Sequence, residues 1–264
     1  MLLDSNPDND AVEKVALFES MMKGETFAFF EVEDFELIIE YYLDLDFKKK
    51  AKKALEVALE QYPIDLALTL IKIEFLNSAQ RFDESLKALN DLNKFHPNNI
   101  DVVVGLGRLN SLTDNKTEAF KYLNLAYQLI LLDTSYNDHL QDLSYEYQQI
   151  GKYDSAVKVL KHILNLRPED ETVMLELGVA YHESGKCEEA INYFQNIIDE
   201  NPYSHIAWFN LATIHNINED WKEAVFGYEM CLVINEKFTA AHYGKANSFI
   251  HLKEYQKAIE SFNE

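Results

Sequence analysis

Two glycines that follow a run of valines form the first candidate for a cofactor-binding site. Three valines precede Gly105 and Gly107 within residues 102–107. A strand that enters a glycine-rich turn is the pattern that binds a dinucleotide phosphate. The third glycine of that pattern is missing, because Asn110 stands in its place, and no alternation of strands and helices surrounds it. We therefore expect no cofactor here.

A run of lysines at residues 48–53, with the sequence KKKAKK, is the only basic cluster in the sequence. Such clusters can bind nucleic acid. Asp44 and Asp46 precede the run, so we interpret it as a solvated helix face that balances neighbouring acids. The formal net charge of −21 at pH 7 also disfavours nucleic acid and anionic membranes, because both attract lysine and arginine. We expect neither as a partner.

Histidines and cysteines gather in the last third of the chain, where they are candidate metal ligands: His182, Cys187, His205, His215, Cys231, His242 and His251. Metal sites of these residues show close spacings such as C-x-x-C or H-E-x-x-H, and none occurs here. A G-x-S-x-G elbow and a P-loop are also absent. We expect no metal and no catalytic residue, and we predict that the chain is not an enzyme.

The compartment is predicted from the cysteines and the N-terminus. Two cysteines are too few for a disulfide framework in 264 residues. The N-terminus lacks a basic segment followed by an apolar run, and no apolar segment reaches transmembrane length. We predict a cytoplasmic protein.

The elements that would position any site are helices in pairs. Within residues 171–202, apolar or small residues fall at helical spacing on two successive stripes, the first formed by Met174, Leu177, Gly178 and Tyr181 and the second by Ala190, Phe194 and Ile197. Small residues at Gly178 and Ala190 would let the two helices approach closely. One such hairpin cannot bury both of its faces, so it implies neighbours.

The same pattern recurs along the chain. Units begin at Val32, Leu66, Ile100, Asn137, Glu171, His205 and Thr239, at a spacing of 34 residues except before Asn137, which comes three residues late. We expect those three residues to lengthen the preceding helix or its loop, around residues 131–136. Asp46, Asp114, Gly151 and Gly185 are expected at the turns within the hairpins, where helix C-caps favour glycine or a small polar residue. The spacing of the units resembles the tetratricopeptide repeat, a helix–turn–helix of about 34 residues. The resemblance implies an all-α, right-handed superhelical solenoid over residues 32–264, with the last repeat incomplete.

Residues 1–31 precede the first repeat. Val12, Val15, Phe18 and Met22 form an apolar stripe, which predicts a helix that follows a cap at Asn9 or Asp10 and packs on the outer end of the solenoid. Up to Asp46, thirteen acids stand against two lysines, so we expect an acidic lead-in to the repeats.

In the tetratricopeptide family, the first helices of successive repeats line a concave groove, and a few positions on each face it. The resemblance therefore implies a ligand groove that grades from acidic to apolar and aromatic. Its candidate residues are Glu33, Glu36, Glu40, Asp44, Leu70, Glu74, Asn77, Arg108, Gln141, Tyr145, Gln148, Gln149, Leu175, Val179, His182, Ile206, Phe209, Thr213, Asn216, Tyr243 and Asn247. The alternative for Leu175 and Val179 is that they pack against adjacent helices.

The resemblance implies a scaffold or adaptor that binds a protein or peptide segment in this groove. Of the family's carboxylate clamp only Arg108 and Asn247 remain, so we do not expect that ligand class. An acidic rim would favour a basic or amphipathic peptide. The alternative is a regulatory or docking region of a larger enzyme or signalling protein whose catalytic domain lies outside these residues.

The end of the sequence carries a further prediction. Residues 254–264 present Ala258, Ile259 and Phe262 on one side, with no polar helix after them to cover that side. We expect further repeats beyond this point, or self-association of two copies through this surface.

Overall fold

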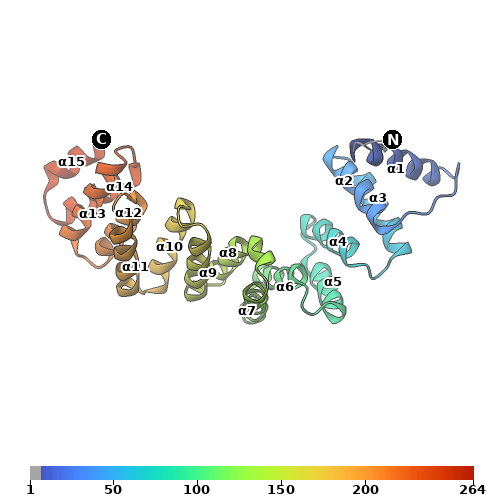
Figure 1. The fold of residues 1–264 in the computed structure, drawn as a ribbon, viewed down its shortest axis with the longest axis horizontal. Helices are drawn as coiled ribbons and strands as arrows, with labels where there is room; N and C mark the ends of the chain where they lie inside the picture. The colour runs from blue at the N-terminus through green and yellow to red at the C-terminus, as the bar shows by residue number, and fades with distance from the viewer. Residues whose placement is uncertain (1–6) are drawn as a thin grey trace. The chain divides into compact units, whose positions relative to one another are not determined.

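The computed structural model describes the backbone of residues 7–264 and the side chains of residues 10–264. Over this part, the chain forms fifteen α-helices and one 3-10 helix, without a strand (Figure 1). The predicted all-α solenoid class is confirmed. No helix in the described part is long and apolar enough to cross a bilayer.

The helices after α1 (Pro7–Met22) alternate as first and second helices of successive hairpins. The first helices are α2 (Val32–Asp44), α4 (Leu66–Ser78), α6 (Ile100–Leu112), α8 (Leu140–Gln149), α10 (Glu171–Ser184), α12 (His205–Ile217) and α14 (Thr239–His251). The second helices are α3 (Lys48–Gln61), α5 (Phe82–Phe95), α7 (Lys116–Leu132), α9 (Tyr153–Leu166), α11 (Cys187–Glu200), α13 (Trp221–Ile234) and α15 (Tyr255–Asn263).

The chain divides into two compact units between Leu125 and Ala126. In each unit, helices pack mainly against the next helix along the chain. Contacts that skip one helix join neighbouring first helices, as in α2 with α4, α10 with α12, and α12 with α14. This nearest-neighbour packing is the arrangement by which a repeat array buries a continuous core.

Helix α1 is attached to the first repeat by an aromatic cluster. Phe18 of α1 lies edge-on to Phe30 and Phe35, with ring centroids 5.8 and 6.3 Å away. All three side chains are buried. Helix α1 begins at Pro7, so the prediction that Asn9 or Asp10 precedes it is wrong. Proline suits the first turn of a helix, because its missing N–H would have no partner there.

Gly178 makes room for a side chain of the next repeat, a contact that the sequence did not predict. A Cβ atom placed on Gly178 would collide with the side-chain amide of Asn210 on α12. The Asn210 Nδ2 atom donates a hydrogen bond of 2.8 Å to the carbonyl oxygen of Met174 on α10. The glycine therefore lets two first helices approach each other.

The three extra residues before the fourth repeat lie in α7. This helix has 17 residues, whereas the other complete second helices have 14. A 3-10 helix follows at Thr134–His139, and α8 begins at Leu140, three residues after the predicted start at Asn137. The Asp133 carboxylate accepts a hydrogen bond of 2.9 Å from the Ser135 amide, which favours this tighter turn.

The turn between the two helices of each hairpin contains one residue with positive φ. These residues are Asp46, Gln80, Asp114, Gly151, Gly185, Glu219 and Lys253. The four predicted from their turn chemistry, Asp46, Asp114, Gly151 and Gly185, are confirmed. The other three are residue types that rarely adopt this conformation.

Candidate functional site

The candidate site is a pocket of about 400 Å³ between the first helices α10 and α12. Five of its lining residues come from the predicted groove: Leu175, Val179, His182, Phe209 and Thr213. The structure thus brings together residues from two repeats that lie about one repeat length apart in the sequence. The other lining residues are Thr172, Glu176, Gly178, Asn210 and Ile214.

Local structure at both helix starts fixes the pocket walls. The Asp170 carboxylate accepts a hydrogen bond of 3.1 Å from the Val173 amide and so caps α10. The Ser204 hydroxyl accepts one of 3.4 Å from the Ala207 amide at the start of α12. From these starts, residues three and four positions apart share one helix face, so Leu175, Val179 and His182 line one wall.

The interior of the pocket is apolar and partly open. Val179 is 55% exposed, so packing against adjacent helices does not account for this side chain. Leu175 is half-buried and does pack partly against its neighbours. Phe209 is fixed by edge-on contact with Phe238, with ring centroids 5.0 Å apart. A fixed aromatic ring beside exposed aliphatic groups can receive an apolar side chain.

One acid that is not among the predicted groove residues, Glu176, lies at the edge of this pocket. Both oxygens of Glu176 accept hydrogen bonds from the Gln141 amide of α8, at 3.2 and 3.0 Å. Burial raises the pKa of Glu176 above its ordinary value, and the Gln141 hydrogen bond partly opposes that shift. Gln141 was a predicted groove residue, and it here positions an acceptor that a basic ligand group could approach.

The other predicted groove residues of this unit differ in their exposure. Tyr145 and Tyr243 are 55% and 61% exposed, and the Tyr243 ring lies 5.6 Å from that of Phe262. Gln148, Asn216 and Asn247 are half-buried, and Gln149 is exposed. Ile206 is only 2% exposed, so the prediction that it faces the groove is wrong. Its side chain belongs to the core.

In the first unit, the predicted acidic residues lie on α2 and α4. Glu33, Glu40, Asp44 and Glu74 are exposed, as is Arg108 on α6, whereas Leu70 is half-buried. Burial raises the pKa of half-buried Glu36, and the nearby carboxylates of Asp65, Glu33 and Glu40 raise it further. Asn77 accepts a hydrogen bond of 2.6 Å from the Ser85 hydroxyl, which ties it to α5.

The residues considered above as candidates for binding a cofactor, nucleic acid or a metal ion are accounted for by their places in the helices. Gly105 and Gly107 lie within helix α6, and a Cβ on Gly107 would come within 2.6 Å of the Leu123 side chain. The lysines of residues 48–53 are exposed around buried Ala51. In the described part of the chain, no three His, Cys, Asp or Glu side chains are grouped so that they could hold a metal ion.

Comparison with known proteins agrees with the hairpin arrangement. The family model for the tetratricopeptide repeat matches residues 149–213. A crystal structure of a tetratricopeptide repeat protein from Parabacteroides merdae is similar, with a TM-score of 0.51 and 17% sequence identity, over 88% of this chain and 90% of that chain. Residues 149–213 thus match the tetratricopeptide repeat, and the chain has the fold of tetratricopeptide repeat proteins.

Two further structures are similar to this chain in fold at low identity. YrrB, described as a TPR protein with an unusual peptide-binding site, is 16% identical with a TM-score of 0.50, over 76% of this chain and 98% of that chain. A structure of Naa15/Naa10 bound to HypK-THB is 20% identical with a TM-score of 0.57, over 87% of this chain but only 35% of that chain. No curated protein matches the sequence. Tetratricopeptide arrays are protein-interaction scaffolds, whose stacked helices offer an extended binding surface.

Proposed function

We propose that this tetratricopeptide repeat protein is a noncatalytic scaffold that binds a peptide segment of another protein along α10 and α12. The observation that carries the proposal is the apolar pocket between these helices, which holds five residues of the predicted groove. Small concave apolar sites with a few polar groups at their edge are typical of ligand binding. The peptide-binding site in the description of YrrB supports the same class of ligand.

The chemistry of the site favours a basic or amphipathic segment. A large apolar side chain would enter between Val179 and Phe209, and a neighbouring lysine or arginine would approach Glu176. The net charge of −21 adds long-range attraction for basic segments. Exposed tyrosines at Tyr145 and Tyr243 would supply further contacts, because tyrosine combines an apolar ring with a polar hydroxyl.

The place of action that we propose is the cytoplasm. Both cysteines of the chain, Cys187 and Cys231, are free, which suits a reducing compartment. The alternative, in which these repeats are the docking region of a larger enzyme, uses the same surface. The experiment below tests the binding activity that both alternatives share.

The test compares two variants in which valine is replaced by glutamate, one inside the pocket and one outside it. Peptides selected from a random display library on the whole chain would be titrated by fluorescence anisotropy. Val179→Glu puts a charge in the pocket, and we expect Kd to rise at least about tenfold, which is ~1.4 kcal/mol. Val233→Glu on α13 makes the same change at a side chain that is 79% exposed, and it should change Kd less than about twofold.

The selected peptides also test the expected chemistry. Enrichment of basic and large apolar residues would support the proposal. Circular dichroism must show that both variants remain folded. Equal weakening by the two variants, or none by Val179→Glu, would overturn the assignment of this pocket.

A second proposed contact joins copies of this chain. Helix α15 exposes Tyr255, Ile259 and Phe262, whose side chains are 59%, 55% and 47% accessible. Neighbouring exposed apolar side chains of this size form an association surface when they are contiguous. We propose self-association through α15.

A further inference from the structure

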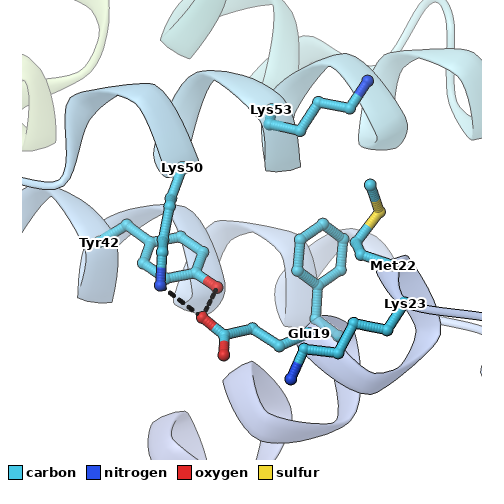
Figure 2. Close-up of a pocket in the computed structure, with 7 residues that line it drawn as sticks. Glu19, Met22, Lys23, Tyr42, Lys50 and Lys53 are labelled. Carbon is cyan, nitrogen blue, oxygen red and sulfur yellow. Dashed lines mark hydrogen bonds and ion pairs between the residues drawn. The ribbon is translucent and has the colours of Figure 1, made fainter. Parts of the chain in front are cut away.

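A second pocket, of about 320 Å³, lies at the N-terminal end of the first unit (Figure 2). Helix α1 contributes Phe18, Glu19 and Met22, and Lys23 follows directly after its end. Helix α2 contributes Tyr42, and helix α3 contributes Lys50 and Lys53. None of these residues belongs to the predicted groove. Lys50 and Lys53 lie on α3, which is the second helix of its hairpin, whereas the proposed groove is formed by the first helices of the hairpins.

The interior of this pocket is apolar and fixed. Phe18 and Tyr42 are 3% and 2% exposed, and Phe18 is held by its edge-on contacts with Phe30 and Phe35. Met22 is 43% exposed, and its side chain extends from α1 toward α3 (Figure 2). A flexible thioether beside rigid rings can adjust to an inserted apolar group.

The charges around the pocket are positive, although the chain as a whole is strongly acidic. Glu19 is the single carboxylate in the lining, and it accepts hydrogen bonds from Lys50 Nζ at 2.6 Å and from the Tyr42 hydroxyl at 3.1 Å (Figure 2). The Glu19 carboxylate is therefore already paired within the protein. Among the described residues, Lys23 has no ion pair, and Lys53 has only Glu56 on its own helix, at 3.5 Å.

The lysines at the start of α3 are unfavourable for the helix dipole, although Lys48 pairs with Asp46 at 3.2 Å. Its first turn carries Lys48, Lys49 and Lys50 and no acid. Positive side chains at a helix N-terminus face the positive end of the helix dipole, which is unfavourable. Positive charge gathered beside an apolar pocket is what would attract an anionic ligand with an apolar part.

We propose that this pocket binds an acidic peptide segment of a partner protein that places a large apolar side chain beside a carboxylate. The apolar side chain enters between Phe18, Met22 and Tyr42. The carboxylate beside it is bound by the ammonium groups of Lys23 and Lys53. The protein then has two sites of opposite charge preference, since the groove of α10 and α12 favours basic segments. Nucleic acid is disfavoured, because thirteen acids lie within the first 46 residues.

The test uses a defined probe and the whole chain. A fluorescein-labelled peptide of six alternating glutamates and phenylalanines is titrated by anisotropy, beside one with lysine in place of glutamate and one with serine in place of phenylalanine. We expect the first peptide to bind and the serine peptide to bind at least tenfold more weakly. The lysine peptide suits the groove of α10 and α12 instead, so Lys53→Glu should not weaken its binding. Added salt should weaken the binding, because exposed charges are screened beyond about 10 Å at 0.1 M salt.

Two charge reversals on one helix give the decisive comparison. Lys53→Glu and Lys52→Glu change the net charge equally, but Lys52 does not line the pocket. We expect Lys53→Glu to raise Kd at least tenfold and Lys52→Glu to change it less than twofold. Lys23→Glu should act like Lys53→Glu from the other side of the pocket. Circular dichroism checks that each variant is folded.

Three results would overturn the proposal. Equal effects of Lys52→Glu and Lys53→Glu would show charge attraction without a pocket. Equal binding of the serine peptide would show that no apolar side chain enters. The third result concerns a second copy of this chain as the occupant of the pocket. In the loop of residues 24–31, Glu25 lies near fully exposed Phe27, so this loop of a second copy would offer the same pair of an acid and a large apolar side chain. Sedimentation that shows self-association lost with both Lys53→Glu and Phe27→Ser would assign the pocket to that second copy.

Discussion

At the contact between α10 and α12, Gly178 and Asn210 lie so close that no further side-chain atom fits between them. We predict that Gly178→Ala lowers the free energy of unfolding by about 1–3 kcal/mol, because the new methyl group forces the Asn210 amide away. That movement also breaks its hydrogen bond to Met174, a loss of about 0.5–1.5 kcal/mol within this total. Urea unfolding followed by circular dichroism measures the change.

A double-mutant cycle separates the clash from a general effect on the helix. In an Asn210→Ala background the colliding amide is absent, so Gly178→Ala should be neutral or should stabilise α10 by up to about 1 kcal/mol, as alanine favours helix over glycine. Equal destabilisation in both backgrounds would contradict the contact.

At the scale of the helical hairpin, the two kinds of helix begin differently. Side-chain caps begin α4, α6, α10 and α12, where Asp65, Asn99, Asp170 and Ser204 accept hydrogen bonds from backbone amides. The second helices whose caps are described, α3, α5, α9, α11, α13 and α15, begin without one. They follow instead the turn whose central residue has positive φ. The short turn therefore positions the second helix, and a side-chain cap positions the first helix in these four hairpins, whereas α8 and α14 begin without one.

The positive φ of a non-glycine residue in this turn predicts that a glycine there would stabilise the protein. Glu219 adopts φ of 65°, which costs a residue with a side chain roughly 1–2 kcal/mol and glycine almost nothing. Glycine loses about 0.5–1 kcal/mol more backbone entropy on folding, so we expect Glu219→Gly to raise the free energy of unfolding by about 0.5–1 kcal/mol. Thermal unfolding followed by circular dichroism measures it.

The matched control reverses the change one repeat earlier. Gly185 has φ of 69° at the equivalent turn position, and Gly185→Ala should destabilise the protein by a similar amount. A decrease in stability for Glu219→Gly would show that its side chain contributes more than the backbone strain costs.

At the scale of the whole molecule, net charge and apolar surface act against each other. Copies that each carry a net charge of −21 repel one another at long range, whereas the exposed face of α15 would attract a second copy at contact. Salt screens the first effect much more than the second. Self-association should therefore increase as salt is raised.

We predict that sedimentation velocity shows concentration-dependent association of the whole chain at high salt and less at low salt. Phe262→Glu should abolish it, because the variant places a charge on the apolar face of α15. Val233→Glu on α13 adds the same charge elsewhere and should leave it intact. A monomer at every salt and protein concentration would contradict self-association.

The sequence by itself determined the helical hairpins and four of their turn residues. A constant spacing of 34 residues, with apolar side chains at helical intervals, specifies which residues each hairpin buries, because that pattern depends on local geometry. Gly151 and Gly185 could be placed in turns because glycine adopts positive φ without a steric cost. The offset before Asn137 could likewise be assigned to α7 or its loop.

How residues of different repeats meet depends on the tertiary structure. It placed Leu175 and Phe209 around one pocket, buried Ile206, set Asn210 against Gly178 and brought Gln141 to Glu176. The lysine-rimmed pocket arises in the same way, since its residues come from three helices. A helical period specifies the face on which a side chain lies, but the distance and rotation between neighbouring helices depend on packing among residues about thirty positions apart.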